Sequence, residues 1–321
     1  MVTVVRYGEQ LPAILAELKP DRPDLPSCRR WRTFRWSVRL GFSIDPRQAL
    51  SELDELRLVE LGAQLGYQAA WTPSGPDAAA FDRCLRWHTA SGLPTGISVV
   101  PASGQPPTFY AEHARRLWEG TSGEFVLGVG SGQMPHAAEG MRQYVAELRE
   151  LLSDGPPIYV AALGPLMLSV AGELADGAAL NWCSPEAVAW SRERVESAAR
   201  AAGRSTPVVA GYIRTSVDPD PNVARRILGA SALQYAFGAG AYRRHFERMG
   251  FREELRRLEK QGGETSDEFL AASGAAGPPG QVRPQFERLA GDLDVAIVRV
   301  LVTRQGDAES ARLTLEECRP L

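Results

Sequence analysis

Two glycine-bearing turns have the residue types of a site that binds an anion through backbone amides. Each turn follows an apolar, strand-like segment. They comprise Gly128, Gly130, Ser131 and Gly132 in the first turn, and Ala161, Ala162, Leu163, Gly164 and Pro165 in the second. Glycine has no Cβ atom, so the backbone can approach a ligand closely at these positions. The second turn leads into the helical segment "LMLSVAGELA", whose first N–H groups and dipole favour a phosphate without any charged side chain.

The sequence lacks the common catalytic and metal-binding motifs. It contains neither an H-E-x-x-H motif nor a G-x-x-x-x-G-K-[ST] phosphate-binding loop. The stretch "GVGSGQ" approaches a dinucleotide fingerprint, but Gln133 stands where the third glycine is required. The four histidines show no metal-ligand spacing, so we expect no metal.

Composition narrows the class of protein. A hydrophobic fraction of 44% in 321 residues is enough to build a large globular core. The net charge of -3 gives no reason to expect nucleic acid as a partner. No apolar run approaches the roughly 20 residues of a membrane helix, and no signal peptide is recognised. Four widely spaced cysteines suit a reducing compartment, so a cytoplasmic protein is expected.

From residue 38 onward the sequence predicts strands that alternate with helices. Apolar runs predict eight strands, at 38–44, 67–72, 95–101, 124–130, 157–162, 177–182, 207–213 and 294–302. The first predicted helix spans 45–66, with Asp45 at its N-cap and Pro46 at its first position. Eight such units predict an α/β fold, a (β/α)8 barrel of the TIM type. A doubly wound open sheet is the alternative.

In a barrel of this type the two glycine-bearing turns open on one face, where the carboxyl ends of the strands meet and active sites form. Residues 222–293 form a long insert between strands seven and eight, helical at first and then loose in "GGETSDEFLAASGAAGPPG". Such an insert commonly builds a lid or a substrate wall. Residues 1–37 are expected to form an N-terminal extension to the barrel domain at 38–321.

From about residue 38 to residue 302 the chain resembles the luciferase-like flavin and deazaflavin oxidoreductases. The resemblance lies in "LVELGAQLGYQAAWTP", "TGISVVPA", "SGEFVLGVGSG", "IYVAALGPLMLSVAGELADGA" and "YRRHFERMGF". It is closest to the actinobacterial branch that uses coenzyme F-420. The resemblance implies that the turn at 161–165 binds the coenzyme's phosphate through backbone amides. It also implies a bulge with a cis peptide bond between Ser98 and Val99, behind the deazaflavin ring.

The sequence departs from its relatives at two positions that matter for the reaction. Many relatives have an acidic residue after the second strand, where this chain has Ser74. Relatives that oxidise a sugar phosphate have a glutamate after the fourth-strand glycines, where this chain has Gln133. Sugar-phosphate oxidation is therefore disfavoured. His136 becomes the candidate proton donor because histidine titrates near neutrality, and Tyr110 or water is the alternative.

Aromatic side chains are expected near the same face. Trp71, Tyr110 and Trp182 end strands or begin helices, so they belong to the core or cover the deazaflavin ring or an apolar substrate. Together with Ser74, the two tryptophans are candidate substrate contacts.

Three functions stay open on the sequence. The first is an F-420-dependent reductase that passes a hydride to an electron-poor C=C or C=N bond of a small organic or peptide-derived substrate. The second is an FMN-dependent monooxygenase of the same superfamily. The third is a barrel that binds a cofactor or metabolite without turnover. Relatives often dimerise, and a homodimer stays open for this chain.

Overall fold

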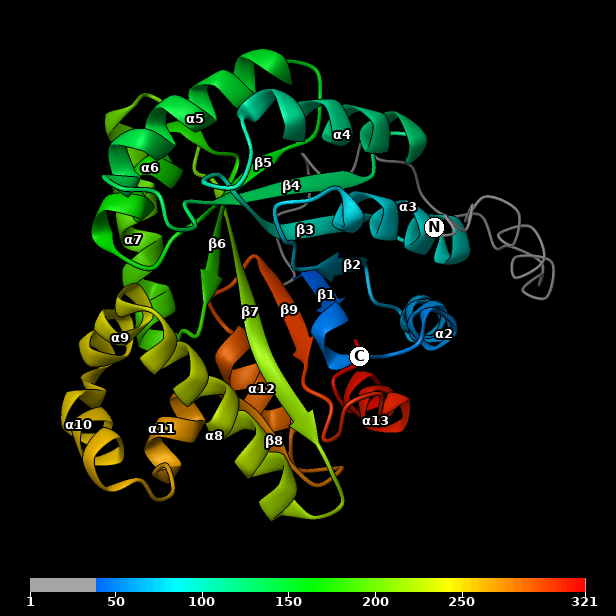
Figure 1. Cartoon of the computed structure of the whole chain (residues 1–321), viewed down its shortest axis with the longest axis vertical. Helices are drawn as coiled ribbons and strands as arrows, with labels where there is room; N and C mark the ends of the chain where they lie inside the picture. Colours follow the sequence, from blue (N-terminus) through cyan, green and yellow to red (C-terminus); the bar gives the residue numbers. More distant parts are fainter. Residues whose placement is uncertain (1–38, 321) are drawn as a thin grey trace, which may run out of the picture.

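The computed structural model describes residues 39–320, and its eight-stranded barrel is made entirely of parallel strands (Figure 1). The barrel strands are β1 (Arg39–Ser43), β2 (Ala69–Thr72), β3 (Thr95–Pro101), β4 (Phe125–Gly130), β5 (Ile158–Ala161), β6 (Gly177–Asn181), β7 (Val208–Val217) and β9 (Val295–Val300). Each strand pairs with the next along the chain, except that β7 pairs with β9. Pairing of β9 with β1 closes the barrel. The predicted TIM-type fold is confirmed, and the open-sheet alternative was wrong.

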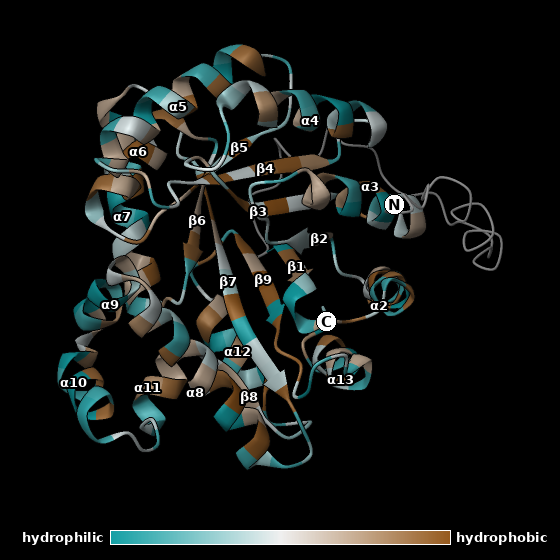
Figure 2. Cartoon of the chain, in the orientation of Figure 1, coloured by the Kyte–Doolittle hydropathy of each residue, from teal (hydrophilic) through white to brown (hydrophobic). Residues whose placement is uncertain are grey.

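Helices surround the barrel, as Figure 1 shows. They are α2 (Glu52–Gln64), α3 (Ala79–Ser91), α4 (Pro107–Gly120), α5 (Ala137–Leu151), α6 (Pro165–Leu174), α7 (Pro185–Ala201), α12 (Arg283–Ala290) and α13 (Ala308–Glu317). Their apolar faces pack on strands that are buried along most of their length. This double-sided burial explains the nearly continuous apolar runs by which the strands were predicted, because strands of a parallel sheet are covered on both faces. Figure 2 shows the apolar residues concentrated on the strands and the inner helix faces.

The insert between β7 and β9 is mainly helical and has its own small core. Its elements are α8 (Pro221–Gly238), α9 (Gly240–Phe246), η3 (Glu247–Phe251), α10 (Arg252–Gln261), α11 (Asp267–Ser273) and β8 (Gly274–Gly277), and α12 follows them. Phe246, Leu255 and Phe269 are among the apolar side chains that pack under α8. Strand β8 pairs in parallel with the end of β7, from Arg214 to Val217.

Two local predictions were wrong. The helix expected from residue 45 begins at Glu52, because Asp45 caps only the short 3-10 turn η2 (Pro46–Gln48). Ala49 then adopts a left-handed conformation with φ 55°, which ends that turn, and Ser51 caps α2. The segment 262–280, expected to be loose, contains helix α11 and strand β8, and β8 forms because β7 offers it a free edge beyond the barrel. The predicted extension at 1–37 lies outside the described residues.

None of the helices within residues 39–320 is long and apolar enough to cross a membrane.

Candidate functional site

The peptide bond between Ser98 and Val99 is cis, as the resemblance implied. It lies near the carboxyl end of β3, where the pairing register with β4 shifts between Ile97 and Val100. Both residues of the bond are half-buried, and Val99 packs against the apolar side chains inside the barrel.

The glycines of β4 make room for this bulge. A Cβ atom on Gly128 would lie 2.4 Å from the carbonyl oxygen of Ile97, and one on Gly130 would lie 2.8 Å from Cγ2 of Val99. Gly132 has a φ of 59°, and a Cβ atom there would lie 2.4 Å from Oγ of Ser103. These three glycines therefore have a packing reason to be glycine. Their role as cofactor contacts stays a prediction.

The segment after β4 is open to solvent. Ser131 is half-buried, and the Gln133 backbone N–H donates to Oγ of Ser103 at 3.1 Å. His136 occupies the N-cap position of α5 with a φ of 47°, and its side chain makes no capping bond. The side chains of Gln133 and His136 are both exposed.

The turn between β5 and α6 is built mainly from backbone groups. Gly164 is the N-cap of α6, Pro165 is its first residue, and no side chain caps the helix. The nearest atom to a Cβ built on Gly164 would be Nη2 of Arg248, at 3.9 Å. The Ala162 N–H, however, donates to the carbonyl of Ala179 at 3.1 Å. This amide is therefore already hydrogen-bonded within the sheet. It is removed from the backbone amides that were predicted to bind the coenzyme's phosphate.

Arg248, from the insert, brings a positive charge to the same turn. Its guanidinium donates to the carbonyl of Leu163, and its Nη2 lies 3.4 Å from Nδ1 of His245. The buried His245 donates through Nε2 to the Trp182 carbonyl at 2.8 Å, because a carbonyl can only accept. Burial and the charge of Arg248 lower the pKa of His245, so this histidine is neutral near pH 7. Arg248 was not singled out from the sequence, although it lies within the family-like stretch "YRRHFERMGF".

A buried ion pair lies where β1 and β9 end. The guanidinium of Arg299 donates to Oδ2 of Asp45 and, at 2.8 Å, to Oγ of Ser43. Asp45 also accepts from Arg47, whose Nη2 is 2.7 Å from Oδ2. Burial raises the pKa of Asp45, but the charge of Arg299 and the bonds from Arg47 outweigh it, so the pKa is lowered. The carboxylate of Asp45 thus holds two arginines.

A second buried arginine has a different environment. Arg214, on β7, is 3% exposed and donates to Oδ1 of Asn181. Its Cζ lies 4.0 Å from the centre of the Trp182 ring and 5.0 Å from that of Tyr235. Among residues 39–320 no carboxylate forms an ion pair with it. Burial lowers the pKa of Arg214 to about 10, which still leaves the side chain charged near neutral pH.

The predicted aromatic residues lie in three different places. Trp71 is buried inside the barrel, packed with Tyr159 and Tyr212. Tyr110 is buried between barrel and helices and donates to the carbonyl of Pro101 at 3.0 Å. Trp182 is buried under the insert. Burial raises the pKa of Tyr110 to about 12, and this hydroxyl is already bonded, which weakens its case as a proton donor.

Ser74 is half-buried after β2, and its hydroxyl donates to the Gly75 carbonyl at 2.7 Å.

Several residues at the carboxyl ends of the strands were missed by sequence reasoning. They are Asp45, Asn181, Arg214, Tyr235, Tyr242, His245, Arg248 and Arg299. The sequence contains a recognisable pattern for two of these residues, Arg214 and Arg299. Arg299 is a single charge inside the apolar run 294–302, and Arg214 directly follows the apolar run 207–213. A fully buried arginine is rare unless it is paired or functional.

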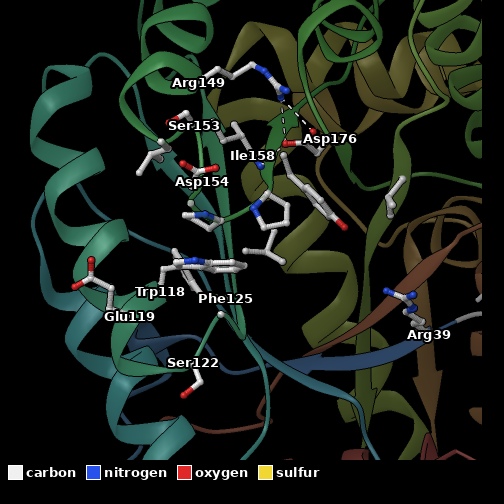
Figure 3. A pocket seen from close by; sticks show the side chains of 18 residues that line it. Arg39, Trp118, Glu119, Ser122, Phe125, Arg149, Ser153, Asp154, Ile158 and Asp176 are labelled. Carbon is white, nitrogen blue, oxygen red and sulfur yellow. Dashed lines mark hydrogen bonds and ion pairs between the residues drawn. The ribbon is translucent and has the colours of Figure 1, made fainter. Parts of the chain in front are cut away.

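A groove among the described residues lies at the opposite end of the barrel, where strands begin (Figure 3). Its volume is about 920 Å³, and it is lined by Trp118, Phe125, Asp154 and Ile158 among others. The ion pair between Arg149 and Asp176, 3.1 Å apart, borders it. Because TIM barrels form active sites at the carboxyl ends of the strands, this groove is not the candidate site. Within residues 39–320 no group of three or more His, Cys, Asp and Glu side chains is placed to hold a metal.

Comparisons with known proteins agree with this geometry. The family model of the luciferase-like monooxygenases matches residues 144–294. A 5,10-methylenetetrahydromethanopterin reductase of Methanopyrus kandleri is 37% identical over 78 residues, which span 24% of this chain and 22% of the relative. The solved coenzyme F420-dependent tetrahydromethanopterin reductase of that organism superimposes with a TM-score of 0.70 at 19% identity, covering 88% of this chain and 98% of the relative. Residues 144–294 of the chain are therefore similar to the luciferase-like monooxygenases.

Other solved structures share the fold at lower identity. An F420-dependent secondary alcohol dehydrogenase in complex with an F420–acetone adduct superimposes with a TM-score of 0.68 at 13% identity, covering 88% of this chain and 98% of that one. The oxygenating constituent of a 3,6-diketocamphane monooxygenase from Pseudomonas putida, in complex with FMN, gives a TM-score of 0.59 at 14% identity with the same coverage. The fold of this chain is therefore shared by one protein solved with an F420 adduct and by one solved with FMN.

Proposed function

We propose that this chain is a luciferase-like, coenzyme F-420-dependent oxidoreductase. It transfers a hydride between the reduced deazaflavin and an electron-poor C=C or C=N bond of an organic substrate. The observation that carries the proposal is the turn between β5 and α6. There, an open N-cap at Gly164, the start of a helix and the exposed guanidinium of Arg248 meet at the carboxyl face of the barrel. The relatives named as F420-dependent support the choice of cofactor.

The residues present fit a phosphate-bearing cofactor. The first amides of α6 and the guanidinium of Arg248 would hold the phosphate, because both favour negative charge. Ser98 and Val99, at the bulge of β3, would support the ring. The bound coenzyme supplies the hydride chemistry, and the protein supplies binding and orientation. His245 fixes this arrangement, since it bonds the Trp182 carbonyl and lies against Arg248.

Binding of the two cofactors to the purified protein tests the proposal. Oxidised F-420 and FMN are titrated separately, and their dissociation constants are compared by fluorescence quenching. We expect F-420 to bind at least about tenfold more tightly, a difference of about 1.4 kcal/mol. Tighter binding of FMN, with oxygen uptake in the presence of reduced FMN, would instead support a monooxygenase, the activity named for one structure of this fold. Tight binding of F-420 without turnover on a panel of unsaturated acceptors would support a binding protein.

A further inference from the structure

Tyr235 lies among positively charged groups at the carboxyl ends of the barrel strands. It projects from α8, and its hydroxyl is 3.4 Å from Nη2 of Arg47. Its ring centre is 5.0 Å from Cζ of Arg214 and 5.4 Å from the ring centre of Trp182. Tyr242, on α9, packs edge-on against the ring at 4.9 Å. The side chain is half-buried, so part of it remains accessible from outside.

The charges around Tyr235 favour its phenolate form. Arg214 from β7, Arg299 from β9 and Arg47 from η2 are the positive groups that act on it. The carboxylate of Asp45 accepts hydrogen bonds from two of these arginines, Arg299 and Arg47. Burial raises the pKa of Tyr235, but the charge of Arg214 and the bond from Arg47 outweigh burial, so the pKa is lowered.

No other tyrosine within residues 39–320 shares this property. The pKa of each remaining one is raised, with burial as the main cause, namely for Tyr67, Tyr110, Tyr144, Tyr159, Tyr212 and Tyr242. The difference follows from position, because Tyr235 alone lies between the guanidinium groups of Arg47 and Arg214. A phenol with a lowered pKa gives up its proton more readily near neutral pH.

Polar contacts connect Tyr235 to the cis peptide. Tyr212, inside the barrel, accepts a hydrogen bond from Ser43 at 3.3 Å and interacts with Ser98. Ser43 accepts from Arg299, which holds Asp45, and Asp45 holds Arg47 beside the hydroxyl of Tyr235. The bulge of β3 and the phenol therefore lie at two ends of one network of contacts across the carboxyl face.

We propose that Tyr235 is the proton donor of the reaction, with Arg214 and Arg47 stabilising the phenolate that it leaves. This inference rests on the proposed function, in which a reduced deazaflavin is the hydride donor. The hydride forms a C–H bond to one atom of the substrate double bond, and the π electron pair moves to the other atom. That atom takes the proton of the Tyr235 hydroxyl as the O–H bond breaks. Solvent returns a proton to the phenolate, and the oxidised deazaflavin would release one proton to solvent, so atoms, electrons and charge balance.

The first test is an ultraviolet titration of tyrosinate in the cofactor-free protein. We expect one tyrosine to ionise below the pH range of the others. This early step should disappear in Tyr235→Phe, move to higher pH in Arg214→Gln, and persist in Tyr144→Phe. Tyr144 is the matched control because it lies on α5 and donates to the Gln105 carbonyl, away from this cluster. An early step that survives in Tyr235→Phe would overturn the proposal.

The second test is turnover with reduced F-420 and a panel of cyclic enones and imines. We expect Tyr235→Phe to lower the rate about 10²–10⁴-fold while F-420 affinity is unchanged. The wild-type rate should fall as pH rises through the pKa of Tyr235, because the phenolate has no proton to give. This alkaline decline should be absent in Tyr235→Phe. An unchanged rate in Tyr235→Phe, with a loss in His136→Ala, would assign the proton to His136 instead.

A failure of the proposed function can be distinguished from a failure of the donor role of Tyr235. A wild-type protein that binds no F-420 would overturn both the oxidoreductase assignment and the donor role, while the titration step of Tyr235 would remain.

Discussion

Arg299 and Asp45 form a buried ion pair that joins the last strand of the barrel to the loop after the first. Both side chains are less than a tenth exposed. The pair thus links β9 to the end of β1. The same carboxylate also holds Arg47, whose Nε and Nη2 both donate to Oδ2.

Removing the charge of Asp45 should destabilise the fold. Asp45→Asn leaves Arg299 buried without its carboxylate, which typically costs about 3–5 kcal/mol. Urea unfolding measures the loss. Asp267→Asn is the control, because Asp267 pairs with Arg225 on the surface, where a pair contributes about 0–1 kcal/mol. Similar losses in both variants would contradict the prediction.

Stability should also depend on pH through Asp45. Its pKa is lowered in the folded protein, so the unfolded chain takes up this proton first as pH falls. The contribution is therefore fully present above the unfolded pKa of about 3.9 and is lost as pH falls through the lower folded value. Unfolding measured across this range should show a smaller pH dependence in Asp45→Asn than in the wild type. Equal slopes would mean that Asp45 does not contribute.

A side chain at Gly164, in the turn between β5 and α6, should leave the fold intact and weaken F-420 binding. Gly164 has an extended φ of -131°, and a Cβ atom there would meet only Nη2 of Arg248 within 4 Å. Gly164→Val should therefore fold normally while weakening F-420 binding at least about tenfold, since the branched side chain fills the space in front of the amides. Arg248→Ala should weaken binding as well. Unchanged affinity in both variants would make the turn a simple connector.

Gly128 should matter for stability. In Gly128→Ala the new Cβ would lie 2.4 Å from the Ile97 carbonyl oxygen, so the bulge of β3 has to move. Overpacking of this kind usually costs about 1–3 kcal/mol. Gly238→Ala is a matched control, because no atom lies within 4 Å of a Cβ built there. If thermal unfolding shows the two variants to be equally stable, the close contact at Gly128 is not limiting.

Cys183 should be unreactive in the folded protein. Burial raises the pKa of its thiol to about 12, so almost no thiolate is present near pH 8. Mass spectrometry after iodoacetamide treatment should show slow modification of Cys183 in the native protein and rapid modification after denaturation. Fast native labelling would mean that its thiol is activated.

The fold was predictable because each strand and helix has a recognisable pattern in its own short stretch of sequence. Each barrel strand is covered on both faces, which gives a run of apolar residues, and turns and caps separate those runs. The failures were also local in origin. Asp45 has the residue type of a helix cap, but its carboxylate bonds Arg299 from 254 positions away, and the chain turns before α2 begins.

The site was less predictable because its side chains come from distant segments. The glycines predicted a site at the end of β4. The atoms nearest to a Cβ built on Gly128 or Gly130, however, belong to the bulge of β3. The guanidinium at the turn after β5 comes from Arg248, 85 positions later. Tyr235 could not be separated from ordinary helix aromatics, because its neighbours Arg47 and Arg214 become close only when the barrel closes.

The groove in Figure 3 has a consequence for the discovery of inhibitors. Strand β4 runs from this groove at Phe125 to the bulge of β3 at Gly130, a rise of about 16 Å at ~3.3 Å per residue. A compound selected because it fills this groove would therefore bind about the length of the barrel away from Val99. Such a compound could leave substrate and coenzyme bound in their places, and its inhibition would not be relieved by adding more of either.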